Sequence, residues 1–194
     1  MSPVSLLLTL AVSAGLTAGP ADLRQDIDAL VACRDLRSAT CLDAAARLGL
    51  AGPPVLAPTR RAMPHMTTAG QVLALTVLDA VPTPAGTRAI LSAAEDERLE
   101  ELVRVMALEE LNEREPRDRR ITLALVDLAD AASPGYRAAV IRALGNRAHG
   151  GEASVLKRLR EASQDPDARV RVEAMLGLGF AEDVVSGPLL VAAL

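Results

Sequence analysis

Residues 165–179 read DPDARVRVEAMLGLG, and the pattern in this stretch decides the fold. The opening Asp-Pro-Asp is typical of a helix start, because Asp167 can cap the helix by accepting backbone N–H bonds. A Val-Arg pair follows at residues 170–171, and then Ala174 and Leu178 at a spacing of four. The stretch predicts a helix whose small residue lets a neighbouring helix approach closely.

The same pattern returns at intervals of 33 and 34 residues, with its arginine recurring as Arg104, Arg137 and Arg171. In all three copies the third residue after the arginine is Ala or Val, and the seventh is Leu. Two weaker copies, around residues 44–48 and within 70–80, keep the small residue and the Leu but lack the arginine. A period of this length indicates five helical hairpins, each contributing one such segment as its second helix.

Five further segments with apolar residues at three- and four-residue steps predict the first helices of these hairpins. They cover residues 22–34, 55–63, 85–95, 117–131 and 152–163. Four prolines between residues 53 and 64 allow only a short first helix in the second hairpin. Half of the 194 residues are hydrophobic, yet Tyr136 and Phe180 are the only aromatics, which favours packed helices over a β-sandwich. The predicted fold class is all-α.

Hairpins of this length cannot bury their apolar faces alone, so stacked copies are expected to share one continuous core. The recurring arginine is then expected to reach an acidic or carbonyl acceptor in a neighbouring hairpin. The resulting polar ladder would run beside the core.

Residues 103–112, 136–145 and 165–179 resemble HEAT repeats of the short bacterial kind, also described as phycobilisome-lyase-like. With the weaker copies the resemblance covers residues 22–194. It implies a right-handed α-solenoid of about five HEAT-like hairpins that acts as a scaffold, binding a protein partner on a concave face lined by second helices. The alternative that it implies is a lyase-like or accessory enzyme subunit similar to the bilin-attaching HEAT proteins.

The candidate binding residues lie on the predicted second helices and are Arg104, Arg137, Arg171 and Glu173. We predict no catalytic residue, metal site or cofactor, because His65 and His149 have no ligand at metal-binding spacing and no phosphate-binding loop occurs. A binding protein is thus favoured over an enzyme. A net charge of −4 and the scarcity of aromatics argue against nucleic acid as a partner.

Residues 1–21 carry no charged side chain, and the apolar run over residues 4–16 is followed by small residues. This pattern resembles a secretory signal peptide, with cleavage after Gly19 or Ala21, although no Lys or Arg precedes the run. The run is too short to span a bilayer comfortably. We expect a periplasmic or secreted protein. The alternative is a cytoplasmic protein whose apolar N-terminal helix covers the first hairpin.

Cys33 and Cys41 are the only cysteines, and they flank the turn of the first predicted hairpin. A disulfide is expected if the protein is exported, since oxidising compartments preserve such bonds. Two buried free thiols are the alternative in the cytoplasm. A redox-active pair is a more remote third possibility, because the spacing lacks the tight C-x-x-C geometry.

Residues 184–194, VVSGPLLVAAL, read as the start of a sixth first helix without a polar partner. End repeats of solenoids need a polar outer face to stay soluble. We therefore expect either that the solenoid continues beyond this sequence and lacks its C-terminal cap here, or that the apolar end docks on another subunit.

Overall fold

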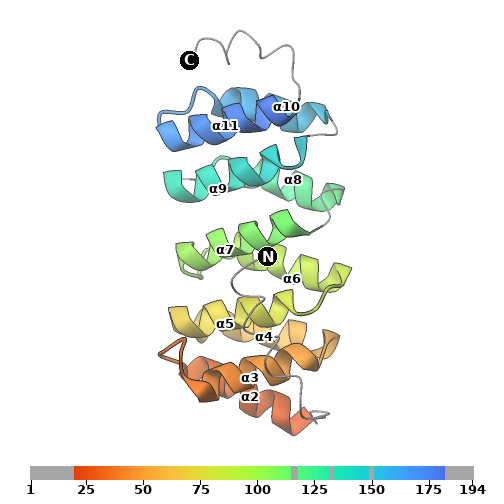
Figure 1. Ribbon diagram of the computed structural model, residues 1–194, viewed down its shortest axis with the longest axis vertical. Helices are drawn as coiled ribbons and strands as arrows, with labels where there is room; N and C mark the ends of the chain where they lie inside the picture. The colour runs from red at the N-terminus through yellow and green to blue at the C-terminus, as the bar shows by residue number, and fades with distance from the viewer. Residues whose placement is uncertain (1–19, 115–117, 132, 149–150, 182–194) are drawn as a thin grey trace. The chain divides into compact units, whose positions relative to one another are not determined.

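The computed structural model describes residues 20–114, 118–131, 133–148 and 151–181, and every regular element within these ranges is helical (Figure 1). The ten α-helices within the described ranges form five hairpins, as predicted. Their bounds are α2 (Pro20–Ala32), α3 (Ala39–Leu50), α4 (Leu56–Ala62), α5 (Thr68–Asp79), α6 (Pro84–Glu95), α7 (Glu101–Glu113), α8 (Arg119–Leu128), α9 (Pro134–Gly145), α10 (Ala153–Ala162) and α11 (Ala168–Phe180).

Three sequence predictions fall mainly on residues outside the described ranges. They concern the signal peptide at residues 1–21, the apolar segment 184–194 and His149. The remaining helix predictions agree with the structure to within a few residues. The largest difference is at α8, which was predicted over residues 117–131 and is found over Arg119–Leu128.

The helix starts follow from local chemistry. A side-chain oxygen of the residue before the helix accepts a backbone N–H bond at five starts, from Thr67, Thr83, Asp118, Ser133 and Asp167. These bonds satisfy N–H groups that the first helical turn leaves without a partner. In the second hairpin, 3-10 turns at Pro53–Val55 and Met63–His65 flank the short helix α4. The prolines therefore shorten this helix as expected.

The chain divides into two compact units, residues 1–107 and 108–194, with the boundary inside α7. In the first unit α3 packs against α2 and α5, and α5 packs against α6. In the second unit α11 packs mainly against α9 and also against α10. Successive second helices are thus neighbours within each unit, as a helical repeat requires.

The repeat register deduced from the sequence coincides with the core. The small residues at the repeated position are all completely buried, and so are the leucines four positions later. They are Ala44, Ala74, Ala107, Val140 and Ala174, with Leu48, Leu78, Leu111, Leu144 and Leu178. Every second helix therefore contributes the same two positions to the core.

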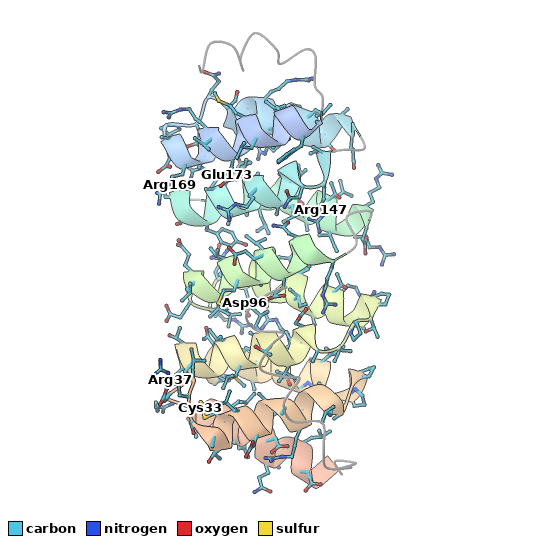
Figure 2. The ribbon with its side chains drawn as sticks, in the orientation of Figure 1. Cys33, Arg37, Asp96, Arg147, Arg169 and Glu173 are labelled. Atoms are coloured by element: carbon cyan, nitrogen blue, oxygen red, sulfur yellow. A yellow bond between two sulfur atoms is a disulfide. The ribbon has the colours of Figure 1, made fainter. Side chains whose placement is uncertain are left out.

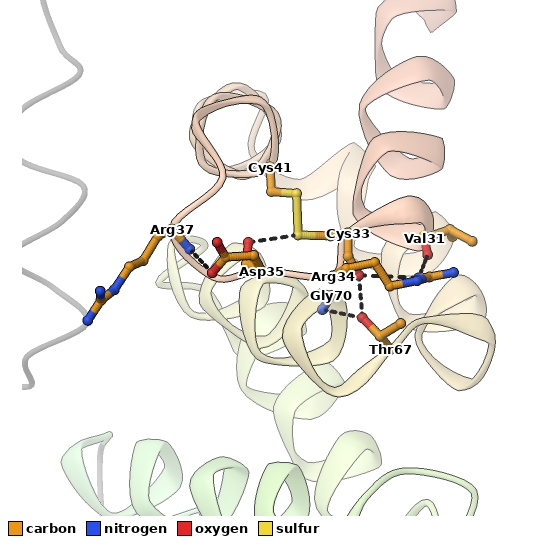
Figure 3. Close-up of a disulfide and its surroundings, with 8 residues drawn as sticks. All are labelled: Val31, Cys33, Arg34, Asp35, Arg37, Cys41, Thr67 and Gly70. Atoms are coloured by element: carbon orange, nitrogen blue, oxygen red, sulfur yellow. Dashed lines mark hydrogen bonds between the residues drawn. A yellow bond between two sulfur atoms is a disulfide. The ribbon is translucent and has the colours of Figure 1, made fainter.

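The first hairpin is closed by a disulfide between Cys33 and Cys41, whose Cα atoms lie 5.9 Å apart (Figure 3). The bond joins the end of α2 to the start of α3. Thr67, which caps α5, donates its hydroxyl proton to the Cys33 carbonyl and accepts the Gly70 N–H at 3.3 Å. The cross-linked turn is thereby tied to the next hairpin. Closing so small a loop contributes about 2–3 kcal/mol in the chain-entropy model.

Helices α9 and α11 meet at two glycines. A Cβ atom placed on Gly145 would lie 2.9 Å from the Gly177 Cα, and one placed on Gly177 would lie 2.8 Å from the Gly145 Cα. Both distances are too short for real carbon contacts. Only hydrogen can occupy these two positions while the helix backbones keep this separation.

We expect Gly177→Ala to lower the free energy of unfolding by about 1–3 kcal/mol, because the new methyl group forces α9 and α11 apart. Gly179→Ala is the matched control on the same helix, since a methyl group there would meet no atom within 4 Å. It should leave stability unchanged or raise it by up to about 1 kcal/mol through helix propensity. Urea unfolding followed by circular dichroism measures both, and equal effects of the two substitutions would contradict the close approach.

Candidate functional site

The repeated arginine occupies the fourth position of the second helix in α7, α9 and α11. Helical side chains lean toward the N-terminus, so each guanidinium reaches back to the turn of its own hairpin. Arg104 donates to the Ala94 carbonyl at 3.0 Å. Arg137 and Arg171 likewise reach carbonyls six residues earlier. The arginines thus satisfy carbonyls that the turn between the two helices leaves without backbone partners.

Arg137 also reaches the next hairpin, as the polar-ladder prediction expects of each repeated arginine, whereas the carbonyls that Arg104 and Arg171 bind lie in their own hairpins. Its Nε and Nη2 atoms donate to the Asp165 carboxylate at 2.7 and 3.0 Å. The two side chains are only 14 % and 12 % exposed. The hydrogen bonds from Arg137 hold the pKa of Asp165 below its usual range, despite the opposing effect of burial. Arg171 donates to the backbone carbonyl of the same Asp165, so the structure brings these two candidate residues together around one turn.

A recess of about 270 Å³ borders this turn. Its charged lining consists of Asp130, Arg137, Arg158, Glu161 and Asp165. Arg158 pairs with both Asp130 and Glu161. The arginines and carboxylates of the recess already pair with each other, so the cluster is suited to holding α8, α9 and α10 together rather than to chemistry.

A second hollow lies between α9 and α11 and is called here the second-helix groove. It has a volume of about 320 Å³ and is lined by Arg142, Gly145, Asn146, Glu173, Leu176, Gly177 and Phe180. The two glycines line it at the helix contact. Their missing side chains explain why a groove exists where the helices are closest.

The polar end of the groove is an ion pair between Arg142 and Glu173, of which only Glu173 was predicted from the sequence. Glu173, a predicted binding residue, accepts hydrogen bonds from Arg142 at 2.8 and 3.1 Å, and Figure 2 shows Glu173 beside α9. Arg142 also lies 3.7 Å from Glu109. These bonds raise the pKa of Arg142, mainly through Glu173. Arg142 and Glu109 were not predicted as site residues. Their spacing could have revealed them, because Glu109, Arg142 and Glu173 follow one another at 33 and 31 residues, close to the repeat length.

The apolar side of the groove continues along α11 as an exposed stripe. Val172, Leu176 and Phe180 are spaced by four residues, so they share one helix face. Their exposed fractions are 54 %, 52 % and 53 %. Single exposed apolar side chains are common on protein surfaces, but several in a row along one helix face indicate an interaction site.

Other site types are not indicated in the described part of the chain. No group of three or more His, Cys, Asp or Glu side chains there is arranged to hold a metal ion. Within the same ranges, no helix has both the length and the apolarity needed to cross a membrane.

Comparison with known families identifies residues 121–194 as HEAT repeats. The matched region starts inside α8 and includes the whole second-helix groove. A search of curated proteins found no match. Residues 121–194 are therefore HEAT repeats, as the repeat spacing predicts, and HEAT repeats generally mediate protein–protein interaction.

We expect Asp165→Asn to lower the free energy of unfolding by about 1–3 kcal/mol at pH 7, because the substitution leaves the largely buried Arg137 guanidinium without its anion. The folded-state pKa of Asp165 lies below the unfolded value. The stabilisation is therefore complete above the unfolded pKa, near 4, and disappears as the pH falls through the folded pKa.

Urea titrations of the two proteins from pH 7 to about pH 2.5 test this expectation. The difference between them should stay constant down to about pH 4 and shrink below it. Lys157→Ala is the control, because Lys157 is 78 % exposed and its ion pair is expected to contribute little. A difference between wild type and Asp165→Asn that is absent at pH 7, or that grows in acid, would exclude the inferred role of the pair.

Proposed function

We propose that this HEAT-repeat protein is a scaffold that binds a protein partner through the second-helix groove between α9 and α11. The main observation in support is the exposed stripe of Val172, Leu176 and Phe180 beside a groove lined by two glycines. Such a groove accepts an inserted apolar side chain, and the stripe extends the apolar contact around it. Apolar anchors in pockets typically dominate protein–protein interfaces.

The charged side chains at the edge of the groove are suited to form the polar rim of an interface. The Arg142 side chain is 48 % exposed and that of Glu109 is 55 % exposed, so their long contact costs little to break. A partner carboxylate can replace Glu109 beside Arg142 while Glu173 keeps its shorter bonds. This arrangement, an apolar centre with exchangeable charges at its edge, is common in reversible interfaces.

The lyase-like alternative has less support. It requires a polar pocket between second helices, for which the nearest candidate residues are Arg104, Arg137 and Glu173. The last two lie in this unit. Arg137 is instead bound to Asp165, and Glu173 to Arg142. Neither side chain is left with an unsatisfied charge that a substrate would compensate.

Site-specific photocrosslinking in the native host tests the scaffold proposal. A photoreactive amino acid replaces either Leu176, in the groove, or Leu123 on α8, which is 45 % exposed and does not line the groove. We expect one protein to crosslink strongly from position 176 and not from position 123, because only the former faces the bound partner.

Leu176→Asp should then abolish co-purification of that crosslinked protein, whereas Leu123→Asp should leave it unchanged. Both substitutions add one charge to an exposed leucine, so a general loss of solubility would affect both. Identical crosslinks from the two positions, or a partner that is retained by Leu176→Asp, would refute binding in the groove.

We further propose that the protein is exported and acts in a periplasmic or secreted location. The uncharged segment 1–21 and the disulfide of Cys33 and Cys41 support this compartment. The intact mass of the native protein should lack about 20 residues and a further two hydrogens. A full-length mass with two free thiols would instead indicate a cytoplasmic protein.

A further inference from the structure

The first unit carries a groove of a different character on its first helices. It lies between α2 and α4, has a volume of about 470 Å³ and is open to solvent. Its lining consists of Leu23, Arg24, Ile27, Pro58, Arg61, Ala62 and His65. It is called here the first-helix groove. It shares no residue with the second-helix groove.

The sequence explains why this groove exists. Four prolines limit α4 to seven residues between two 3-10 turns, whereas α2 has thirteen. The short helix leaves part of the α2 surface uncovered. The lining residues of each helix follow helical spacing, because Leu23 and Ile27 are four apart, as are Pro58 and Ala62. Two neighbouring helix faces thus form the apolar floor.

Every group in the lining that can carry a charge is basic. Arg24, Arg61 and His65 are exposed, and in the described part of the chain none of them forms a hydrogen bond or an ion pair through its side chain. This sets them apart from Arg47, Arg60 and Arg98 of the same unit, which have carboxylate partners. In a chain of net charge −4, arginines left without an acidic partner around an apolar floor indicate a place for an external acid.

The spacing of the positive charges selects the type of acid. Arg24 lies on one wall, and Arg61 and His65 lie one helical turn apart on the other. Residues 58 to 65 extend over about 12 Å, because the α-helical rise applies up to Ala62 and the larger 3-10 rise from there to His65. A fatty acid has one carboxylate at one end and cannot satisfy both walls. A helix with an apolar stripe and carboxylates on either side of it can.

We propose that the first-helix groove binds an acidic amphipathic helix of a partner protein. Its apolar stripe packs on Leu23, Ile27 and Ala62. Carboxylates that flank the stripe pair with Arg24 on one wall and with Arg61 on the other. This is the helix-in-groove mode of recognition, in which the apolar stripe supplies affinity and the charges supply orientation and selectivity.

Fluorescence anisotropy with two synthetic probes tests the proposal on the full chain. Both probes are fluorescein-labelled peptides, helical and about four turns long, with one leucine stripe that is flanked by glutamates in one and by lysines in the other. We expect the glutamate peptide to bind at least about tenfold more tightly at low salt, and to lose that advantage as salt is added. In Arg24→Glu/Arg61→Glu the preference should reverse in favour of the lysine peptide.

Arg88→Glu is the matched control, because Arg88 is an exposed arginine on α6 that does not line the groove. It should leave the preference for the glutamate peptide in place. Equal binding of both peptides, binding of neither, or a preference that survives Arg24→Glu/Arg61→Glu would overturn the proposal. Stronger binding to laurate or to vesicles containing phosphatidylglycerol than to the glutamate peptide would also overturn it, in favour of a lipid.

Discussion

The buried pair of a small residue and a leucine four positions later is the constraint on which the structure depends. It recurs in all five second helices, and each of its members is completely buried. A helical hairpin cannot bury such a face alone, so the pair contributes to stability only when the next hairpin is present. Next to this pair on α9 and α11, Gly145 and Gly177 meet with no side chain between the two helix backbones. Within each unit, close packing of this kind fixes the register of neighbouring second helices, and the second-helix groove follows from that register.

The polar contacts have a secondary but definite role. Each repeated arginine points back along its helix to a carbonyl in or next to the turn that precedes the helix, so it closes its own hairpin. Arg137 adds a link to the next hairpin through Asp165, and Arg60 makes a comparable link to Asp96. In both pairs an arginine binds an aspartate in the first-to-second-helix turn of the following hairpin. The aspartate carries a lowered pKa in each case, because its charged form accepts the hydrogen bonds of arginine side chains. Turns, which contribute little apolar area, are thereby held in place by charge.

The sequence was sufficient for the features that repeat and insufficient for those that do not. Helix number, the buried register and the short α4 were all predictable, because spacing, leucine position and proline chemistry are local properties. The second-helix groove was not, since its shape depends on two glycines that meet only when α9 and α11 are packed. Arg142 was missed for a related reason. It pairs with Glu173 across 31 residues, which is shorter than the 33- to 34-residue repeat. The spacing differs because Arg142 is the ninth residue of α9 and Glu173 is the sixth residue of α11, so the two do not occupy equivalent repeat positions.

The distribution of unpaired charge separates the structural surfaces from the binding surfaces. Around Asp165 and Asp130 the arginines and acids are matched, and a further ligand would have to break existing pairs there. The first-helix groove is the opposite case, because its arginines stand beside apolar side chains with no acid among its lining residues. The second-helix groove is intermediate, with one short pair and one long pair around Arg142. Since separating a matched pair costs free energy and pairing an unmatched charge releases it, selectivity for charge should be strongest in the first-helix groove. Apolar contacts should dominate binding in the second-helix groove.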